Sequence, residues 1–377
     1  TPPAVARRGR FRAPGGGSPL WPDAGLRAGA GKAGPAAALL SAYRRYGDSL
    51  LAKISGHFAI VLFDIEAGKA LFATDRFVTH PIAYSVDSST ALLVASRADT
   101  VARQPGVNAA ISPQSIFNYT FFHMVPSPGT VYAGVAKLEP ATTARFDGRN
   151  VRTQRYWMPR YPERWPSEAE IIERMQPILL RAVEAAEPGD ASGAFLSGGL
   201  DSSTVVGMLA KVQPAKTFSI GFSEEGYDEM EYARTSARHF KTGPNEYYVQ
   251  PADVAVAVPR IAAAYDEPFG NSSAVPTMFC ARLAAQSGVT HLLAGDGGDE
   301  LFGGHERYAR QKVFERYSMI PQPLRKLLLE PLLRSPFGAL PGIPGKMRSY
   351  AQQAPGGMPL RLVTSNFVQH QRPAQLL

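Results

Sequence analysis

The sequence predicts two domains of different class: an α+β domain, followed by an α/β domain built on a doubly wound parallel sheet. Three observations support this prediction. The chain has 377 residues, which is long enough for two domains. Apolar strands joined by short turns dominate residues 37–157. From residue 158 onward strands and helices alternate, a rhythm typical of a parallel sheet covered by helices on both faces.

The first domain begins after an unusual leader. Residues 1–36 are rich in Ala, Gly, Arg and Pro without periodicity, so we expect them to be disordered. Residues 1–50 carry eight Lys/Arg against two Asp/Glu, so most of the net charge of +8 gathers there. The expected helices are 37–51 and 113–125, and the expected strands are 58–64, 70–74, 81–84, 91–96 and 143–146.

The second domain follows a proline-rich linker. Ser167 and Glu170 form a capping-box pattern, which predicts a helix from there to about Ala185. The strands expected after it are 194–196, 217–221, 246–249 and 291–294, and the helices are 201–212, 228–240, 252–264 and 275–287. Ligands of such sheets bind at the carboxyl ends of the strands.

The clearest motif lies in residues 193–210, which read GAFLSGGLDSSTVVGMLA. An apolar strand runs into Ser197-Gly198-Gly199, and a helix follows, which is the layout of an anion site. Ser197 and Ser202 can add hydroxyl donors. Asp201 would repel a bare phosphate, so its presence suggests a divalent cation. The hypothesis is a pyrophosphate-plus-magnesium pocket; the alternative is an ordinary βα turn with capping serines.

Two further polar clusters follow predicted elements. Residues 294–304 read AGDGGDELFGG, where three carboxylates stand among glycines. Clustered carboxylates repel one another unless a cation joins them or one is protonated, and the alternative is a solvated acidic turn. Residues 265–273 contain the second cluster, with Asp266, Glu267, Asn271 and Ser272; the family resemblance given below implies that these residues select the substrate. A plain loop with helix-capping residues is its alternative.

Several classes of protein are excluded or disfavoured. Cys280 is the one cysteine, so a disulfide framework, a cysteine-based zinc site and an iron–sulfur cluster are excluded. No apolar run reaches the length of about 18 residues that a membrane span needs, so no membrane partner is expected and a cytoplasmic location follows by default. Nucleic acid is not expected as a partner, because no basic run with interleaved aromatics lies near the motifs. Walker and nucleophile-elbow patterns are absent.

With these residues laid out, the chain resembles the glutamine-dependent asparagine synthetases over about residues 50–377. Four ordered motifs carry the resemblance: SGGLDSS at 197–203, KTFSIGF at 216–222, DEP at 266–268 and GDGGDELFGG at 295–304. The resemblance implies a partial Ntn-hydrolase-like β-sandwich followed by an ATP-pyrophosphatase domain of the adenine nucleotide α-hydrolase-like type. It also implies that ATP activates aspartate or a similar carboxylate, and that ammonia, supplied from glutamine in the family, forms an amide.

The resemblance also implies roles for individual residues. ATP and its pyrophosphate would be bound by Leu196, Ser197, Gly198, Gly199, Asp201, Ser202, Ile220, Ala294 and Gly295. Asp201 and Asp299 would hold Mg²⁺, and Asp296 and Asp299 would be catalytic. Asp296 stands where the family usually has a glutamate that orients or deprotonates the attacking amine. A homodimer is one candidate assembly.

The chain departs from the family at both ends. The family's glutaminase nucleophile is a cysteine directly after the initiator Met, and no cysteine here precedes Cys280, so we expect the glutaminase-like domain to be incomplete and inactive. The C-terminal part looks truncated, and none of Lys312, Lys326 and Lys346 stands in a convincing context for the family's catalytic lysine. Three alternatives stay open: a synthetase that forms a β-lactam or macrolactam on another carboxylate, a tRNA-modifying ATP pyrophosphatase, and an inactive fragment.

Overall fold

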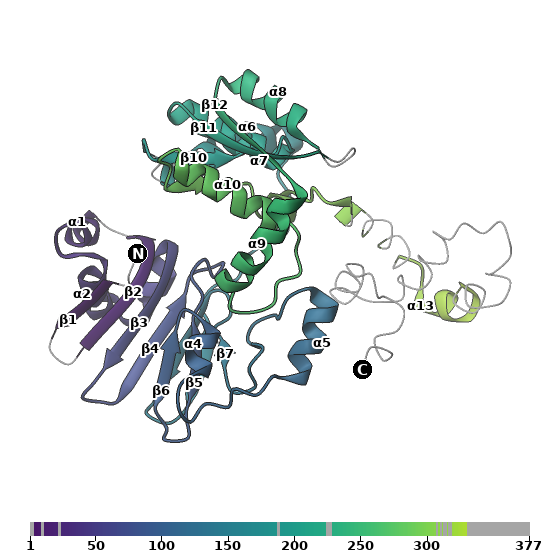
Figure 1. Ribbon diagram of the computed structural model, residues 1–377. Helices are drawn as coiled ribbons and strands as arrows, with labels where there is room; N and C mark the ends of the chain where they lie inside the picture. The colour runs from purple at the N-terminus through teal and green to yellow at the C-terminus, as the bar shows by residue number, and fades with distance from the viewer. Residues whose placement is uncertain are drawn as a thin grey trace. The chain divides into compact units, whose positions relative to one another are not determined.

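The computed structural model describes residues 4–8, 11–21, 24–186, 189–223 and 228–306, with 308–309, 311, 315 and 319–329 beyond them (Figure 1). The chain divides into two compact units. The first, here called the antiparallel unit, comprises Thr1–Trp165 and Ala262–Asn271. The second, the parallel unit, comprises Pro166–Ile261 and Ser272–Leu377. The compact units divide at 165/166, and Ala262–Asn271 of the predicted second domain belong to the first unit, while the domain boundary at 157/158 stays a prediction.

The antiparallel unit contains two sheets. Its strands are β1 (Ala4–Arg8), β2 (Phe11–Leu20), β3 (Ser55–Asp64), β4 (Lys69–Thr74), β5 (Ala83–Val86), β6 (Leu92–Ala95), β7 (Ala136–Lys137), β8 (Thr142–Phe146) and β9 (Val151–Arg155). The larger sheet has the order β1-β2-β3-β4-β8-β9, the smaller β6-β5-β7, and every pair of neighbours is antiparallel. Its helices are α1 (Ala24–Ala33), α2 (Pro35–Tyr46), η1 (Gly47–Ser49), α3 (Leu50–Lys53), α4 (Ala98–Ala102) and α5 (Pro113–Phe122).

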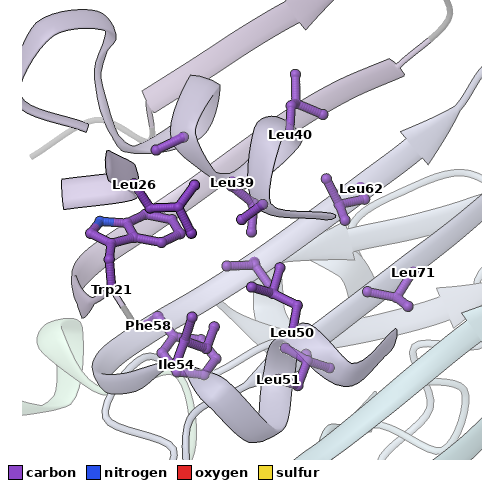
Figure 2. Packing of buried hydrophobic residues seen from close by; sticks show 14 residues of the cluster. Trp21, Leu26, Leu39, Leu40, Leu50, Leu51, Ile54, Phe58, Leu62 and Leu71 are labelled. Carbon is purple, nitrogen blue, oxygen red and sulfur yellow. The ribbon is translucent and has the colours of Figure 1, made fainter. Parts of the chain in front are cut away.

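Three apolar clusters stack this unit into layers. Figure 2 shows the first, in which Trp21 and Leu39 from the helical side meet Phe58 and Leu62 of β3. A second cluster around Phe72 joins the two sheets. A third packs α4 against the small sheet. The layers are therefore helices, large sheet, small sheet and helix, which confirms the α+β prediction for this part of the chain.

The prediction of a disordered leader is wrong for the described part of residues 1–36. β2 pairs with β3 from Phe11–Asp64 to Leu20–Ser55, and β1 pairs with β2. The segment reads FRAPGGGSPL, and its glycines and prolines have low strand propensity. The open edge of β3 offers backbone donors and acceptors that need partners, so tertiary pairing overrides local propensity.

The parallel unit contains the predicted doubly wound sheet. Its strands are β10 (Ser192–Phe195), β11 (Lys216–Phe222), β12 (Gly243–Val249) and β13 (His291–Leu293), in the order β12-β11-β10-β13. All three pairs of neighbours are parallel. The helices are α6 (Glu168–Ala185), α7 (Leu200–Val212), α8 (Met230–Phe240), α9 (Pro251–Ala264), α10 (Ala274–Gln286), α11 (Gly298–Phe302) and α13 (Gln322–Leu324), and a π-helical turn, η2, covers Arg325–Leu329.

Successive residues of β10 point to opposite faces of this sheet. Ala194 packs with α6, α7 and α8 in one cluster, and Phe195 packs with α10 in another. Helices therefore cover both faces, as the alternating pattern predicts. Figure 1 shows α7 and α10 beside β10 in this unit.

Local capping signals read from the sequence are also confirmed. The Ser167 Oγ accepts from the Glu170 N–H, and the Glu170 carboxylate accepts from the Ser167 N–H, so α6 begins with a complete capping box. The helix predicted over 37–51 is instead divided at Gly47, whose φ is +53°. Among the described residues, no helix is both long and apolar enough to cross a membrane.

Candidate functional site

The order of the parallel strands reverses between β10 and β13. From β10 the chain runs outward through β11 to β12, and it then returns to the other side of β10 as β13. Where strand order reverses in this way, the loops at the carboxyl ends diverge and leave room for a ligand. The loop after β10 and the loop after β13 both start at this point, so the structure brings the two predicted loops to the same edge of the sheet.

Serine hydroxyls brace the loop after β10. The Ser197 N–H donates to Ser202 Oγ at 3.2 Å, and the Gly199 N–H donates to Ser197 Oγ at 3.2 Å. The two hydroxyl oxygens lie 2.9 Å apart, and Ser202 also donates to the Gly199 carbonyl. Ser202 is 9% exposed. The predicted ligand donors Ser197 and Ser202 thus have a clear role in holding the loop, and their contact with a phosphate stays a prediction.

The helix after this loop begins without a side-chain cap. Gly199 is the N-cap of α7 and has no side chain to accept a hydrogen bond, whereas Ser197 Oγ accepts from the Gly199 N–H, so the alternative of an ordinary βα turn with capping serines stays open. The first turn of a helix carries unpaired N–H groups and partial positive charge. An anion is the natural acceptor there.

Gly198 is required by the close approach of α8. Its φ is +89°, and a Cβ built on it would lie 2.5 Å from the Ala233 N and 2.5 Å from the Tyr232 Cβ. Both features exclude an L side chain without movement of the backbone. The loop is therefore pressed against the start of α8.

Asp201 lies between two glycines of the acidic loop. A Cβ on Gly295 would lie 2.8 Å from the Asp201 carbonyl carbon and 2.9 Å from the Ser202 N. A Cβ on Gly298 would meet the Asp201 carboxylate, 2.5 Å from Oδ2. The Gly298 N–H donates to the Gly295 carbonyl at 3.1 Å, which closes the turn around this carboxylate. The two motifs that the sequence separates by about ninety residues are therefore in contact.

The carboxylates at this edge are accessible. Asp201 is half-buried, whereas Asp296 and Asp299 are exposed. Gly298, which the Asp201 carboxylate contacts, is the neighbour of Asp299 in the chain. In the described part of the chain, no three His, Cys, Asp or Glu residues gather closely enough to hold a metal ion. Of the described carboxylates at this edge, at most two could therefore share one ion, and one or two is the number that Mg²⁺ commonly takes when phosphate oxygens and waters complete its shell.

The predicted nucleotide contacts differ in accessibility. Leu196 is 2% exposed and packs in the core, and its N–H donates to the Phe218 carbonyl at 2.9 Å. Its contact with a ligand would therefore involve its backbone. Ile220 is half-buried on β11, and Ala294 is exposed at the end of β13. Their roles stay predictions.

The predicted substrate cluster is divided between the units. Asp266, Glu267 and Asn271 belong to the antiparallel unit, and Ser272 to the parallel unit. The carboxylates of Asp266 and Glu267 accept hydrogen bonds from the backbone of Ala98 and Val131. The structure thus uses them to hold the chain. Asn271 and Ser272 are exposed, and their contact with substrate stays a prediction.

The remaining residues singled out from the sequence are Cys280 and three lysines. Cys280 is buried, burial raises the pKa of its thiol to about 12, and its Sγ lies 3.3 Å from the Phe218 carbonyl. It is therefore an unreactive core residue, as predicted. Lys326 is exposed, whereas Lys312 and Lys346 lie outside the described residues.

Sequence reasoning did not single out Arg97 and Lys137. Both bind the segment 262–271 by hydrogen bonds, Arg97 to the Ala264 carbonyl and Lys137 to Glu267. Their partners are more than a hundred residues away, so no local pattern could have found them.

Comparison with known protein families agrees with this architecture. Residues 33–157 match the model of a glutamine amidotransferase domain, and residues 176–375 match the model of asparagine synthase. The fold and the site thus define a two-domain protein that joins an amidotransferase-type domain to a parallel-sheet domain of a type that uses ATP. The second match covers more than half of the chain, and the chain belongs to the asparagine synthase family.

The chain is similar to several curated proteins. Asparagine synthetase (glutamine-hydrolysing) 1 of Bacillus subtilis is 29% identical over 80% of this chain and 48% of its own length. A putative asparagine synthetase 2 of Methanocaldococcus jannaschii is 32% identical over 76% of this chain and 57% of its own length. Amidase chry2 of Gibberella zeae is 26% identical over 74% of this chain and 44% of its own length. The chain spans about half the length of the curated relatives it matches.

Proposed function

We propose that the chain forms an amide in an ATP-dependent reaction, converting aspartate, ATP and ammonia to asparagine, AMP and pyrophosphate. The observation that carries this proposal is the contact of Asp201 with Gly295 and Gly298 at the switch point of the parallel sheet. It joins an anion-type loop to an acidic loop, as a site for a nucleotide with a metal ion requires. The relatives named asparagine synthetase support aspartate as the acid.

The reaction has two steps. A carboxylate oxygen of aspartate attacks the α-phosphorus, the bond to the β-phosphate bridging oxygen breaks, and pyrophosphate leaves with the electron pair. Ammonia then attacks the acyl carbon, loses a proton, and AMP leaves. The first N–H groups of α7 would stabilise the charge on the leaving pyrophosphate. Asp296, exposed in the second loop, would accept the proton or orient the amine.

Asp201 and Asp299 would hold Mg²⁺. The Asp201 carboxylate lies on Gly298, the residue before Asp299, and this placement fits a shared cation. When bound, the ion neutralises charge that builds on the phosphate oxygens.

Free ammonia is the proposed nitrogen donor of this chain. The residues 33–157 have the amidotransferase-type fold, but the family nucleophile is a cysteine and this sequence has none before Cys280. We therefore expect no glutamine hydrolysis by the 377-residue chain.

Another carboxylate is the second candidate substrate. It is favoured by the similarity to the fungal amidases chry2 and chyE, each 26% identical. The loops after β10 and β13 would activate that acid in the same way.

A pyrophosphate-release assay tests the proposal. The purified chain, ATP and Mg²⁺ are incubated with aspartate and ammonium chloride, or with aspartate and glutamine, and asparagine is measured by mass spectrometry. We expect pyrophosphate and asparagine with ammonium only. No pyrophosphate with aspartate in either mixture would exclude the asparagine reaction and direct the search to other acids. Equal turnover with glutamine would contradict the proposed nitrogen source.

A further inference from the structure

The two loops of the candidate site contain no lysine or arginine. The loop after β10 reads SGGLDSS at 197–203, and the loop after β13 reads AGDGGDELFGGHE at 294–306. Pyrophosphate is an anion, so a protein binds it through cationic side chains, through N–H and O–H donors, or through a metal ion. Without lysine or arginine, these loops depend on neutral donors and on the metal ion, and each hydroxyl near them matters.

The serine hydroxyls of the first loop are bonded within the protein. Ser202 Oγ donates to the Gly199 carbonyl at 3.2 Å, and it lies 2.9 Å from Ser197 Oγ. Since the single hydrogen of Ser202 is used for the carbonyl, the Ser197 hydroxyl donates to Ser202. Ser203 Oγ lies 2.9 Å from Ser236 Oγ of α8. These hydroxyls hold the loop, so a further hydroxyl donor for a ligand would come from a neighbouring element.

The first turn of α8 is that neighbouring element. A Cβ built on Gly198 would lie 2.5 Å from the Tyr232 Cβ and 2.5 Å from the Ala233 N. Ala233 is 2% exposed, whereas Tyr232 is 69% exposed. The backbone of α8 therefore packs directly on the loop, with Ala233 in the core and the Tyr232 side chain accessible beside Gly198.

The Tyr232 side chain is directed toward the edge of the sheet that carries both loops. β11 leads into α8, so the N-terminus of α8 lies at the carboxyl ends of the parallel strands. The Cα–Cβ bond of a helical residue is tilted toward the N-terminus of its helix, and Tyr232 is the third residue of α8. Among the described residues, none is a hydrogen-bond partner of the Tyr232 hydroxyl. This hydroxyl is thus a donor near the loop that the fold does not use.

The cation that follows Tyr232 in α8 is engaged elsewhere. Arg234 binds Glu231 at 2.7 Å and Glu246 of β12 at 2.7 Å. Two carboxylates therefore hold its guanidinium, and the charge of Glu231 beside Tyr232 is offset by the same pair. The first turn of α8 offers the loop the Tyr232 hydroxyl rather than a cation.

We propose that the Tyr232 hydroxyl donates a hydrogen bond to the pyrophosphate part of a nucleotide bound at the loop after β10. A hydrogen bond from a neutral hydroxyl strengthens as negative charge grows on its acceptor, so Tyr232 stabilises the leaving pyrophosphate more than the bound ATP. The proposal rests on the proposed function for the place of the nucleotide, and it does not depend on which acid is activated.

Calorimetric titration with inorganic pyrophosphate and Mg²⁺ tests this contact. Tyr232→Phe should weaken binding about tenfold, as expected when a hydrogen bond to a charged group is lost. Thr235→Val is the matched control, because it removes an exposed hydroxyl of the same helix that donates to the Glu231 carbonyl, and it should bind as the wild type does. AMP, which lacks the β- and γ-phosphates, should bind equally to the wild type and to Tyr232→Phe. Unchanged pyrophosphate binding by Tyr232→Phe would overturn the proposal.

Two comparisons separate the hydroxyl from the ring and this proposal from the proposed reaction. Tyr232→Ala should weaken pyrophosphate binding by the same factor as Tyr232→Phe, and a loss in Tyr232→Ala alone would overturn the role of the hydroxyl. Because Tyr232 is exposed, neither substitution removes core packing. Weaker pyrophosphate binding by Tyr232→Phe, in a chain whose wild type forms no asparagine, would support this proposal and contradict the asparagine reaction. Asparagine formation with equal KM for ATP and equal pyrophosphate binding in both would do the reverse. A wild type that binds neither pyrophosphate nor ATP would overturn both.

Discussion

Asp75 of the antiparallel unit and the acidic loop of the parallel unit place carboxylates in opposite environments. In the antiparallel unit Asp75 is 2% exposed and accepts hydrogen bonds from the N–H groups of Phe58, Phe77 and Thr79 and from the Thr79 hydroxyl. In the parallel unit Asp296 and Asp299 are exposed in a glycine-rich turn. A buried carboxylate stabilises a fold when the surrounding groups donate hydrogen bonds to it. Exposed carboxylates gathered beside an uncapped helix start are available to a ligand.

Glycine supplies the tight positions around the candidate site, at Gly198 and Gly295. Away from that site, both units place non-glycine residues at positive φ: Val78, Thr90, His123 and Ala141 in the antiparallel unit, and Lys241 in the parallel unit. A site that must approach a ligand closely needs glycine, whereas a packed domain can carry some strain.

The largest expected effect is at Asp201. Asp201→Asn should lower the rate of pyrophosphate release by about 10²–10³-fold, because it removes charge aimed at the metal–phosphate region. Thermal stability should change little, since the side chain is only half-buried. Asp190→Asn, an exposed carboxylate of the same unit, is the control. Wild-type turnover in Asp201→Asn would place the nucleotide elsewhere.

Gly295 tests the contact between the two loops. Gly295→Ala should lower turnover and cost about 1–3 kcal/mol in the free energy of unfolding, because its Cβ would meet the backbone of Asp201 and Ser202. Gly189→Ala has open space around the new Cβ and should leave both quantities near wild type. Kinetics and urea unfolding of the two variants measure the difference. Equal behaviour would mean that the two loops are not held together in solution.

The predictable part of the molecule was local or followed a general rule. The run Ser197-Gly198-Gly199 after an apolar strand marks the loop, and the strand–helix rhythm places it beside the loop after β13. The contacts of Ser202 and Glu267 and the strand β2 could not be predicted from local sequence patterns. Ser202 braces the loop through tertiary geometry, and Glu267 meets Lys137 across 130 residues. β2 forms a strand against its propensity because β3 needs a partner.

Asp75 tests the buried side of the comparison. Burial raises the pKa of its carboxyl, but the Thr79 hydroxyl and three backbone N–H groups together hold it below its usual value. Asp75→Asn should lower the free energy of unfolding by about 1–3 kcal/mol at pH 7. The substitution replaces one acceptor oxygen by an NH₂ group, which would face N–H and O–H groups that also donate. A depressed pKa stabilises the fold above the ordinary carboxyl pKa of about 4, and that stability is lost as the pH falls through the folded-state value.

Tryptophan fluorescence can follow the Asp75 effect. Trp21, Trp157 and Trp165 all lie in the antiparallel unit, so urea unfolding monitored in this way reports that unit. The difference between wild type and Asp75→Asn should narrow as the pH falls below about 4. Glu163→Gln, exposed in the same unit, should show no such trend. A difference that is independent of pH would mean that the loss is one of packing rather than of charge.

The smallest expected effect is a gain in stability at Val78. Its φ is +54°, a conformation that a β-branched residue adopts only under strain. Val78→Gly should relieve that strain and raise the free energy of unfolding of the antiparallel unit by about 0.5–1 kcal/mol, after the entropy cost of glycine is subtracted. Thr100→Gly, within α4, should instead lower it by a similar amount. Opposite signs in the tryptophan-monitored urea curves would show that Val78 carries backbone strain of the kind that glycine avoids at Gly198 in the candidate site. A loss in both variants would mean that the side-chain packing of Val78 outweighs its strain.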